Sequence, residues 1–174
     1  MDKRTFVLPE PAKKELKEVK QKPPPKIRKA ADAWAFANKD ELTFEQQLLI
    51  LENKDLTNPL FNKMKQQITN KIHSYRSQDI KKSLLDSDKL VDTEFVINLL
   101  LNKQCLCFYC REPTLVLYDE VRAAKQWTLD RMDNSQGHNK NNVEIACLTC
   151  NLRRRTMYHE RYVFTKQLNI VKLG

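Results

Sequence analysis

Glycine is scarce in this sequence: Gly137 and Gly174 are the two glycines among 174 residues. Ordinary globular proteins contain about 7% glycine. All-β sandwiches and barrels connect many short strands through turns that are rich in glycine and proline. The shortage of glycine therefore argues against a β sandwich and favours helices joined by short, constrained loops.

Long hydrophobic runs are also missing. The sequence contains no stretch of about 18 consecutive apolar residues, the length that signals a membrane-spanning helix. The first 20 residues, MDKRTFVLPEPAKKELKEVK, lack the apolar segment and the small-residue cleavage site of a secretory signal. We therefore expect a soluble, intracellular protein without a membrane partner.

Acidic residues are outnumbered at both ends of the chain, although the formal net charge is only +9. Residues 1–30 contain 10 Lys/Arg against 4 Asp/Glu, and residues 147–174 contain 6 against 1, whereas residues 31–146 contain 15 against 17. Basic ends of this kind predict contact with a polyanion, most simply nucleic acid. For the N-terminal run alone, a solubilising tail is the alternative.

Five cysteines occur in a chain without an export signal, which argues against a disulfide scaffold and for metal binding. Cys107–Cys110 and Cys147–Cys150 are two C-x-x-C pairs separated by 36 residues. Two such turns supply the four thiolates of a tetrahedral structural zinc site. The alternative is that some of these cysteines are small buried apolar residues. Cys105 is left out of the predicted Zn²⁺ site because its spacing from Cys107 does not suit a turn of this kind.

The N-terminal part of the chain divides into two regions. Residues 1–29, which include KPPPKIRKA, are predicted to form a disordered, basic, proline-rich arm, and PPPKIRK matches the pattern of a nuclear import signal. Residues 30–103 have helical periodicity. A capping box at Thr43–Gln46 begins one helix, Asn58-Pro59 begins a second, and Asp92–Asn102 forms a third. We expect this helical region to grip DNA or to dock on a protein partner.

The pattern changes in residues 104–174. TLVLY, QWTLD and NVEIA read as short strands, and a helix is predicted from Cys147 to about Gln167. The predicted fold is therefore α+β, with a helical N-terminal part followed by a small zinc-stabilised β/α module. Polar residues between the two later strands form a crossing loop, in which Gly137 is expected to supply the free backbone torsion of a tight return.

The segment from Cys107 to Arg155 resembles the HNH, or His-Me finger, nuclease family through CFYC, TLDRMDNSQGH, NNV and CLTCN, in that order. It is most similar to the LDRxDNxxGH variant that is common in large DNA viruses and phages. The resemblance implies a ββα-metal fold that cleaves phosphodiester bonds with one divalent cation, Mg²⁺ or Mn²⁺. By position, Asp130 matches the metal-binding acidic residue, and Asn142 matches an Asn that braces the loop or helps to hold the cation. Asn151 stands where many members carry the last His or Asn.

The sequence departs from this family at Arg131, which replaces the usual general-base histidine. The pKa of arginine lies above about 12, so Arg131 cannot accept a proton at neutral pH, although it can clamp a phosphate. His138 is the candidate base instead; the alternative is that it only bonds within the loop or touches phosphate, with cleavage impaired or lost. Of Arg153, Arg154 and Arg155, we expect two to contact DNA phosphates, a solvated face being the alternative.

Two functions remain open from the sequence. The first is a metal-dependent HNH-type endonuclease acting on DNA, with Asp130, His138 and Asn142 at its centre. The second is a non-catalytic zinc-stabilised module that binds nucleic acid, such as a transcription, replication or packaging factor. A pure protein-interaction adaptor fits the basic ends less well. Either nucleic-acid function suits the nucleus, or a replication site in a host cell if the protein is viral.

Overall fold

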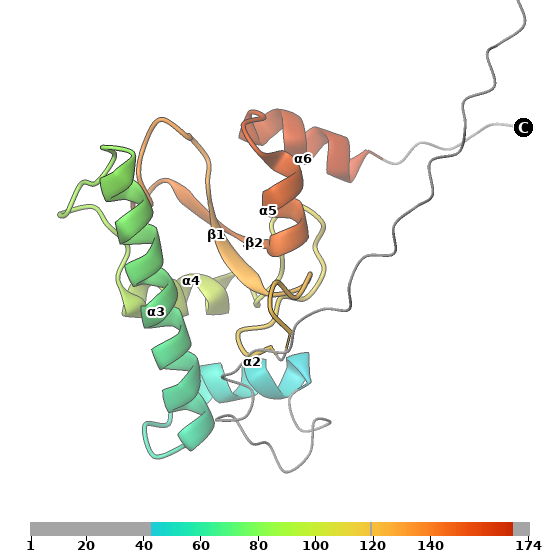
Figure 1. Ribbon diagram of the computed structural model, residues 1–174. Helices are drawn as coiled ribbons and strands as arrows, with labels where there is room; N and C mark the ends of the chain where they lie inside the picture. Colours follow the sequence, from blue (N-terminus) through green and yellow to red (C-terminus); the bar gives the residue numbers. More distant parts are fainter. Residues whose placement is uncertain (1–42, 119, 169–174) are drawn as a thin grey trace, which may run out of the picture.

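The computed structural model describes residues 43–118 and 120–168, so the predicted basic arm and the start of the predicted helical region lie outside it (Figure 1). The described residues form a mixed α+β fold with five helices and one two-stranded sheet. The elements follow one another as α2 (Phe44–Asn53), α3 (Pro59–Lys81), α4 (Thr93–Asn102), β1 (Trp127–Arg131), β2 (Val143–Cys147), α5 (Leu148–Arg154) and α6 (His159–Gln167). Among these helices, none is both long and apolar enough to span a membrane.

Helices α2 and α3 begin where their capping residues predict. At α2, the Thr43 hydroxyl accepts from the backbone N–H of Gln46, whose side chain accepts in return from the Thr43 N–H. At α3, the Asn58 side chain accepts from the Leu60 N–H at 2.8 Å, and Pro59 occupies the first helical position, where no N–H is needed. These caps satisfy donors that have no partner inside the helix.

The buried face of α3 is the apolar stripe that the sequence predicts, with one change at its start. Met64, Ile68 and Ile72 are buried, and Phe61, rather than the half-buried Leu60, extends the stripe toward the N-terminus. Helix α4, capped by the Asp92 side chain, contributes Val96, Ile97 and Leu100 to the same core.

The two strands pair antiparallel, with Asp130 opposite Glu144 and Trp127 opposite Cys147. They correspond to the predicted strands QWTLD and NVEIA. The third predicted strand, TLVLY, is not a strand: Leu115 makes only an isolated bridge to Gln126. The buried side chain of Gln47 replaces a neighbouring strand there, because its amide oxygen accepts from the N–H groups of Val116 and Leu117 at 2.9 Å each.

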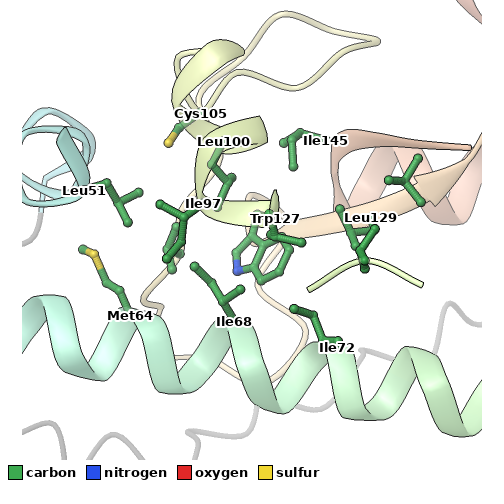
Figure 2. Close-up of a cluster of buried hydrophobic side chains, with 14 of the residues drawn as sticks. Leu51, Met64, Ile68, Ile72, Ile97, Leu100, Cys105, Trp127, Leu129 and Ile145 are labelled. Carbon is green, nitrogen blue, oxygen red and sulfur yellow. The ribbon is translucent and has the colours of Figure 1, made fainter. Parts of the chain in front are cut away.

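One hydrophobic core joins the helices to the sheet. Trp127 is fully buried and lies between the side chains of α3 and α4 in Figure 2. Leu129 and Ile145, from the two strands, belong to the same cluster. The helical region and the module that follows it therefore share their core, and α3 is held beside the loop that connects β1 to β2 (Figure 1).

The C-terminal helix is interrupted. The sequence predicts one helix from Cys147 to about Gln167, but α5 ends at Arg154 and α6 starts at His159. Arg155 adopts φ 52° and ψ −115°, a backbone conformation that no helix can continue through. The break turns α6 back over the cysteine pairs, where Tyr162 packs in a second small core with Tyr109 and Ala146.

Candidate functional site

Four cysteines converge on one point of the structure. The sulfur atoms of Cys107, Cys110, Cys147 and Cys150 all lie within 4.8 Å of one another, and Cys110 and Cys147 are 4.0 Å apart. A zinc ion bound by four sulfurs at about 2.3 Å would set them about 3.8 Å apart. The cluster could therefore hold a structural metal ion such as zinc. Cys105 is excluded from it, as predicted, because its side chain is buried in the main hydrophobic core.

Local hydrogen bonds shape each pair of cysteines into a turn. In the first, the N–H of Arg111 donates to the Cys107 carbonyl at 2.9 Å. In the second, Cys147 ends β2 and caps α5, with its sulfur accepting from the Cys150 N–H at 3.4 Å. A hydrogen bond between the sulfurs of Cys107 and Cys147 lowers the pKa of Cys107 and raises that of Cys147, so without a metal ion the pair shares one negative charge. A bound cation would stabilise the thiolate form of all four cysteines, which is the form that binds metal.

Asp130 lies near the end of β1, where the resemblance places a metal ligand, but its carboxylate already has protein partners. One oxygen accepts from the Tyr109 hydroxyl and from Arg154 Nε, both at 2.6 Å, and the other accepts from Arg154 Nη2 at 2.8 Å. Burial and the Asp130 charge raise the pKa of Tyr109, so its hydroxyl keeps its proton and donates. A cation that bound Asp130 would compete with Arg154 for these oxygens.

Arg154, one of the three arginines among which two phosphate contacts were expected, points into the protein. It is 2% exposed, and besides Asp130 its guanidinium donates to the carbonyls of Arg131 and Met157 and to the Asn134 side chain. Every guanidinium nitrogen is thus used inside the protein. The helix turns this position inward while Arg153 and Arg155, on either side of it, are exposed.

Asn142 braces the loop, which is one of the two roles that the resemblance implies for it. Its Nδ2 donates to the carbonyls of Asp133 and Gly137 at 2.9 and 3.0 Å, and its Oδ1 accepts from the Asp133 N–H at 2.9 Å. The oxygen that would bind a cation is therefore engaged in closing the loop. Asn142 acts as a structural clamp between the two ends of this loop.

Gly137 is required by space and not by torsion, which corrects the sequence-based expectation. Its φ is not positive, so the backbone conformation is one that other residues can adopt. A Cβ at this position would lie 2.5 Å from the carbonyl oxygen of Leu84 and 3.0 Å from a carboxylate oxygen of Asp79. The loop is therefore pressed against the C-terminal end of α3 at this point.

His138 is held by α3. Its backbone N–H donates to one oxygen of Asp79 at 2.7 Å, and its Nδ1 lies 2.9 Å from the other. The ring stacks on Tyr75, with centroids 4.4 Å apart. Burial lowers the pKa of His138, with Arg131 and Lys82 acting in the same direction and Asp79 against them. A lowered pKa favours the neutral ring, which is the form that a general base requires.

A cavity of about 270 Å³ lies between α3, the loop and α5. Asp130, His138 and Asn151 line it together with three cationic side chains, Lys82, Arg131 and Arg155. The remaining lining residues are Tyr75, Gln78, Leu129, Asn134 and Leu152. Asn142, Arg153 and Arg154, which were predicted for the same site, do not line it.

Two of the polar groups in this cavity are fixed by hydrogen bonds to neighbouring residues. Asn151 donates through Nδ2 to the Thr128 hydroxyl at 3.0 Å and to the Leu129 carbonyl at 3.3 Å, which leaves its Oδ1 as the acceptor for a ligand. Arg131 donates through Nη1 to the Gln136 carbonyl at 3.0 Å, so its guanidinium is folded toward its own loop. The cavity is therefore lined by three cationic side chains and contains an oriented acceptor, the Oδ1 atom of Asn151.

Sequence reasoning missed the residues that α3 and its C-terminal end contribute to this site. Tyr75 and Lys82 line the cavity. Asp79 does not line it but bonds to His138, from which 59 positions separate it. Asp79 had one available signal: it takes the next position of the buried stripe that includes Ile72 and Tyr75, and buried acids are rare unless they are paired.

Comparisons of the chain with protein-family models, with curated proteins and with solved structures give no match. A functional interpretation therefore depends on the residues themselves. It depends on two arrangements: four cysteines that could hold a metal ion, and a basic cavity lined by Asp130, His138 and Asn151.

Proposed function

We propose that the chain is a metal-dependent endonuclease of the HNH type, which hydrolyses phosphodiester bonds of DNA. The observation that carries the proposal is the cavity in which Asp130, His138 and Asn151 meet three cationic side chains. Hydrolysis of a phosphodiester needs a base for the attacking water and positive charge around the phosphate. Both requirements are met by groups on the walls of one cavity.

The cationic side chains would bind the substrate. Lys82, Arg131 and Arg155 come from three different parts of the chain and converge on the cavity. Arginine forms parallel hydrogen bonds with phosphate oxygens, and lysine adds a compact charge. These groups would hold the scissile phosphate close to His138 and stabilise the negative charge that grows during hydrolysis.

His138 would act as the general base. Its Nδ1 is engaged with Asp79, and its neutral ring has Nε2 left to accept the proton of the attacking water. Arg131 occupies the position that the family resemblance assigns to the base and cannot serve in that role. The proposal therefore moves the base from β1 to the loop.

The cysteine cluster would hold a structural Zn²⁺. Four thiolates close the coordination shell and leave no position for water, so this ion would stabilise the fold and take no part in chemistry. It would join the turn at Cys107–Cys110 to the end of β2 and the first turn of α5, the helix that carries Asn151 and ends next to Arg155.

The catalytic cation fits the site only in part. Asp130 and Asn151 offer the oxygen donors that Mg²⁺ or Mn²⁺ prefers, and such an ion would polarise the phosphate when bound. The Asp130 oxygens, however, are used by Arg154 and Tyr109. The proposed roles of His138 and the cationic side chains therefore do not depend on the cation.

The engagement of Asp130 by Arg154 favours a second candidate function, a non-catalytic zinc-stabilised module that binds nucleic acid. The Arg154 guanidinium, which is bonded to both oxygens of Asp130, can neutralise this carboxylate in place of a metal ion. In that case the basic cavity would still bind phosphate, and affinity for DNA would fall steeply with salt because counterions are released on binding.

A cleavage assay distinguishes the two. The full chain is incubated with supercoiled plasmid, a DNA junction and single-stranded DNA in buffers with Mg²⁺, with Mn²⁺ or with neither ion. Zinc content is measured by elemental analysis in each condition, so that loss of the structural ion is not mistaken for loss of the catalytic one. Metal-dependent cleavage at constant zinc supports the nuclease; salt-sensitive binding without cleavage of any substrate supports the binding module.

A further inference from the structure

We infer that Asp79, on α3, is the positioning residue that makes His138 a base; the inference rests on the proposed function. The Asp79 carboxylate makes two hydrogen bonds with His138: one oxygen accepts from the backbone N–H at 2.7 Å, and the other lies 2.9 Å from Nδ1. Both side chains are deeply buried, Asp79 at 1% and His138 at 6% exposure. Two bonds to one residue fix the loop backbone and the ring together.

This contact selects one tautomer of the imidazole. An ionised carboxylate only accepts hydrogen bonds, so Nδ1 must carry a proton in order to bond to it. In the neutral ring Nε2 then has no proton and keeps its lone pair. None of the hydrogen bonds among the described residues uses Nε2, and this atom is not among the buried polar atoms without a partner. Nε2 is therefore accessible, and because His138 lines the cavity we infer that this nitrogen faces it.

The surroundings hold the pair in this arrangement. Tyr75 stacks on the ring from α3, one helical turn before Asp79. The Asp79 carbonyl accepts from the Leu84 N–H at 2.9 Å, which folds the chain after α3 back so that the Leu84 carbonyl lies against Gly137. A side chain larger than glycine would push the loop away from α3 and lengthen both contacts of Asp79. The helical region thus supplies a part of the reaction centre.

The variant Asp79→Asn separates positioning from packing, because it keeps the shape of the side chain. Its amide oxygen can still accept from the His138 N–H. The amide NH₂ then faces Nδ1 and donates to it, which places the ring proton on Nε2. Asp88→Asn, an exposed position shortly after α3, is the matched control. The tautomer is read at pH 7.5, because burial lowers the pKa of His138 and so favours the neutral ring there.

The experiment measures two properties of the full zinc-loaded chain. The ¹⁵N shifts of the histidine rings report the tautomer of His138, and single-turnover cleavage of plasmid in Mg²⁺ reports the rate. We expect the Nδ1–H tautomer in the wild type and in Asp88→Asn, and the Nε2–H tautomer in Asp79→Asn. Cleavage by Asp79→Asn should fall roughly 10²–10⁴-fold, the cost of losing a general base, with DNA affinity and zinc content nearly unchanged.

The outcomes separate this inference from the proposed function. An active wild type with the Nε2–H tautomer would overturn the inference alone, and so would an Asp79→Asn variant that switches tautomer but cleaves at the wild-type rate. A wild type with the Nδ1–H tautomer that cleaves no substrate would overturn the proposed function and, with it, the catalytic role of Asp79.

Discussion

Replacing Arg154 by methionine should destabilise the protein strongly. The substitution keeps an unbranched side chain of similar length but leaves the Asp130 carboxylate buried with the Tyr109 hydroxyl as its remaining partner. Both side chains of the pair are almost inaccessible, at 1% and 6% exposure, so water would stabilise the lone carboxylate less well than the guanidinium does. Removing one partner of a buried ion pair costs about 3–5 kcal/mol, which is a large part of the stability of an ordinary domain.

Two further variants test whether the loss of stability arises because the Asp130 carboxylate stays buried without its cationic partner. Arg153→Met removes a neighbouring arginine that is exposed, and its free energy of unfolding should stay within about 0.5 kcal/mol of the wild type. The double variant Asp130→Asn with Arg154→Met removes both charges while the Tyr109 hydroxyl keeps an acceptor. It should recover a large part of the loss, since replacing a whole buried pair is often close to neutral.

The assay is urea unfolding at a fixed concentration of zinc, followed by tryptophan fluorescence, because Trp127 lies in the shared core. The free energies of unfolding of the four proteins are compared. If Arg154→Met were as stable as Arg153→Met, the assignment of Arg154 to a buried structural pair would be refuted. Arg154 would then have to be reconsidered as a surface residue that is free to contact DNA.

Three further outcomes follow from the site. Cys147→Ser should lose the metal ion and unfold the segment around the cysteine cluster, which elemental analysis and circular dichroism would show; a folded, zinc-replete variant would contradict it. Gly137→Ala should lower the free energy of unfolding by about 1–3 kcal/mol in urea unfolding, because its Cβ would overlap the Leu84 carbonyl; an unchanged value would contradict it. Since burial lowers the pKa of His138 and the deprotonated ring is the base, the cleavage rate should hold as pH falls to about 6.5 and decline only below it; a decline centred above pH 7 would point to another group.

Local signals predicted the starts of α2, α3 and α4 and two of the three expected strands. The capping box at Thr43 and the Asn58-Pro59 pair satisfy helix donors through residues close in sequence, so their effect can be read without the tertiary structure. The two C-x-x-C pairs could be joined into one cluster because a metal ion needs four ligands. TLVLY failed as a strand because its partner is a side chain, Gln47, from a distant helix.

The parts of the site that sequence could not predict depend on tertiary packing. Three consecutive arginines look alike in sequence, but the helix turns Arg154 toward Asp130 and leaves its neighbours outside. The pairing of Asp79 with His138 joins residues 59 positions apart, and nothing local in either segment indicates it. Gly137 suggested a special torsion, whereas its actual constraint is the closeness of the chain after α3. In each case the identity of the neighbour decides the role of the residue.

The most direct test of the central claim is the single-turnover cleavage rate of His138→Gln beside His73→Gln, at saturating DNA in Mg²⁺. His73 is exposed on α3, so its replacement removes a histidine without touching the cavity lined by His138. If His138 is the base, His138→Gln should cleave roughly 10²–10⁴-fold more slowly than the wild type, while His73→Gln cleaves normally and both variants keep their zinc and their DNA affinity. Equal cleavage rates for the two variants would contradict the account.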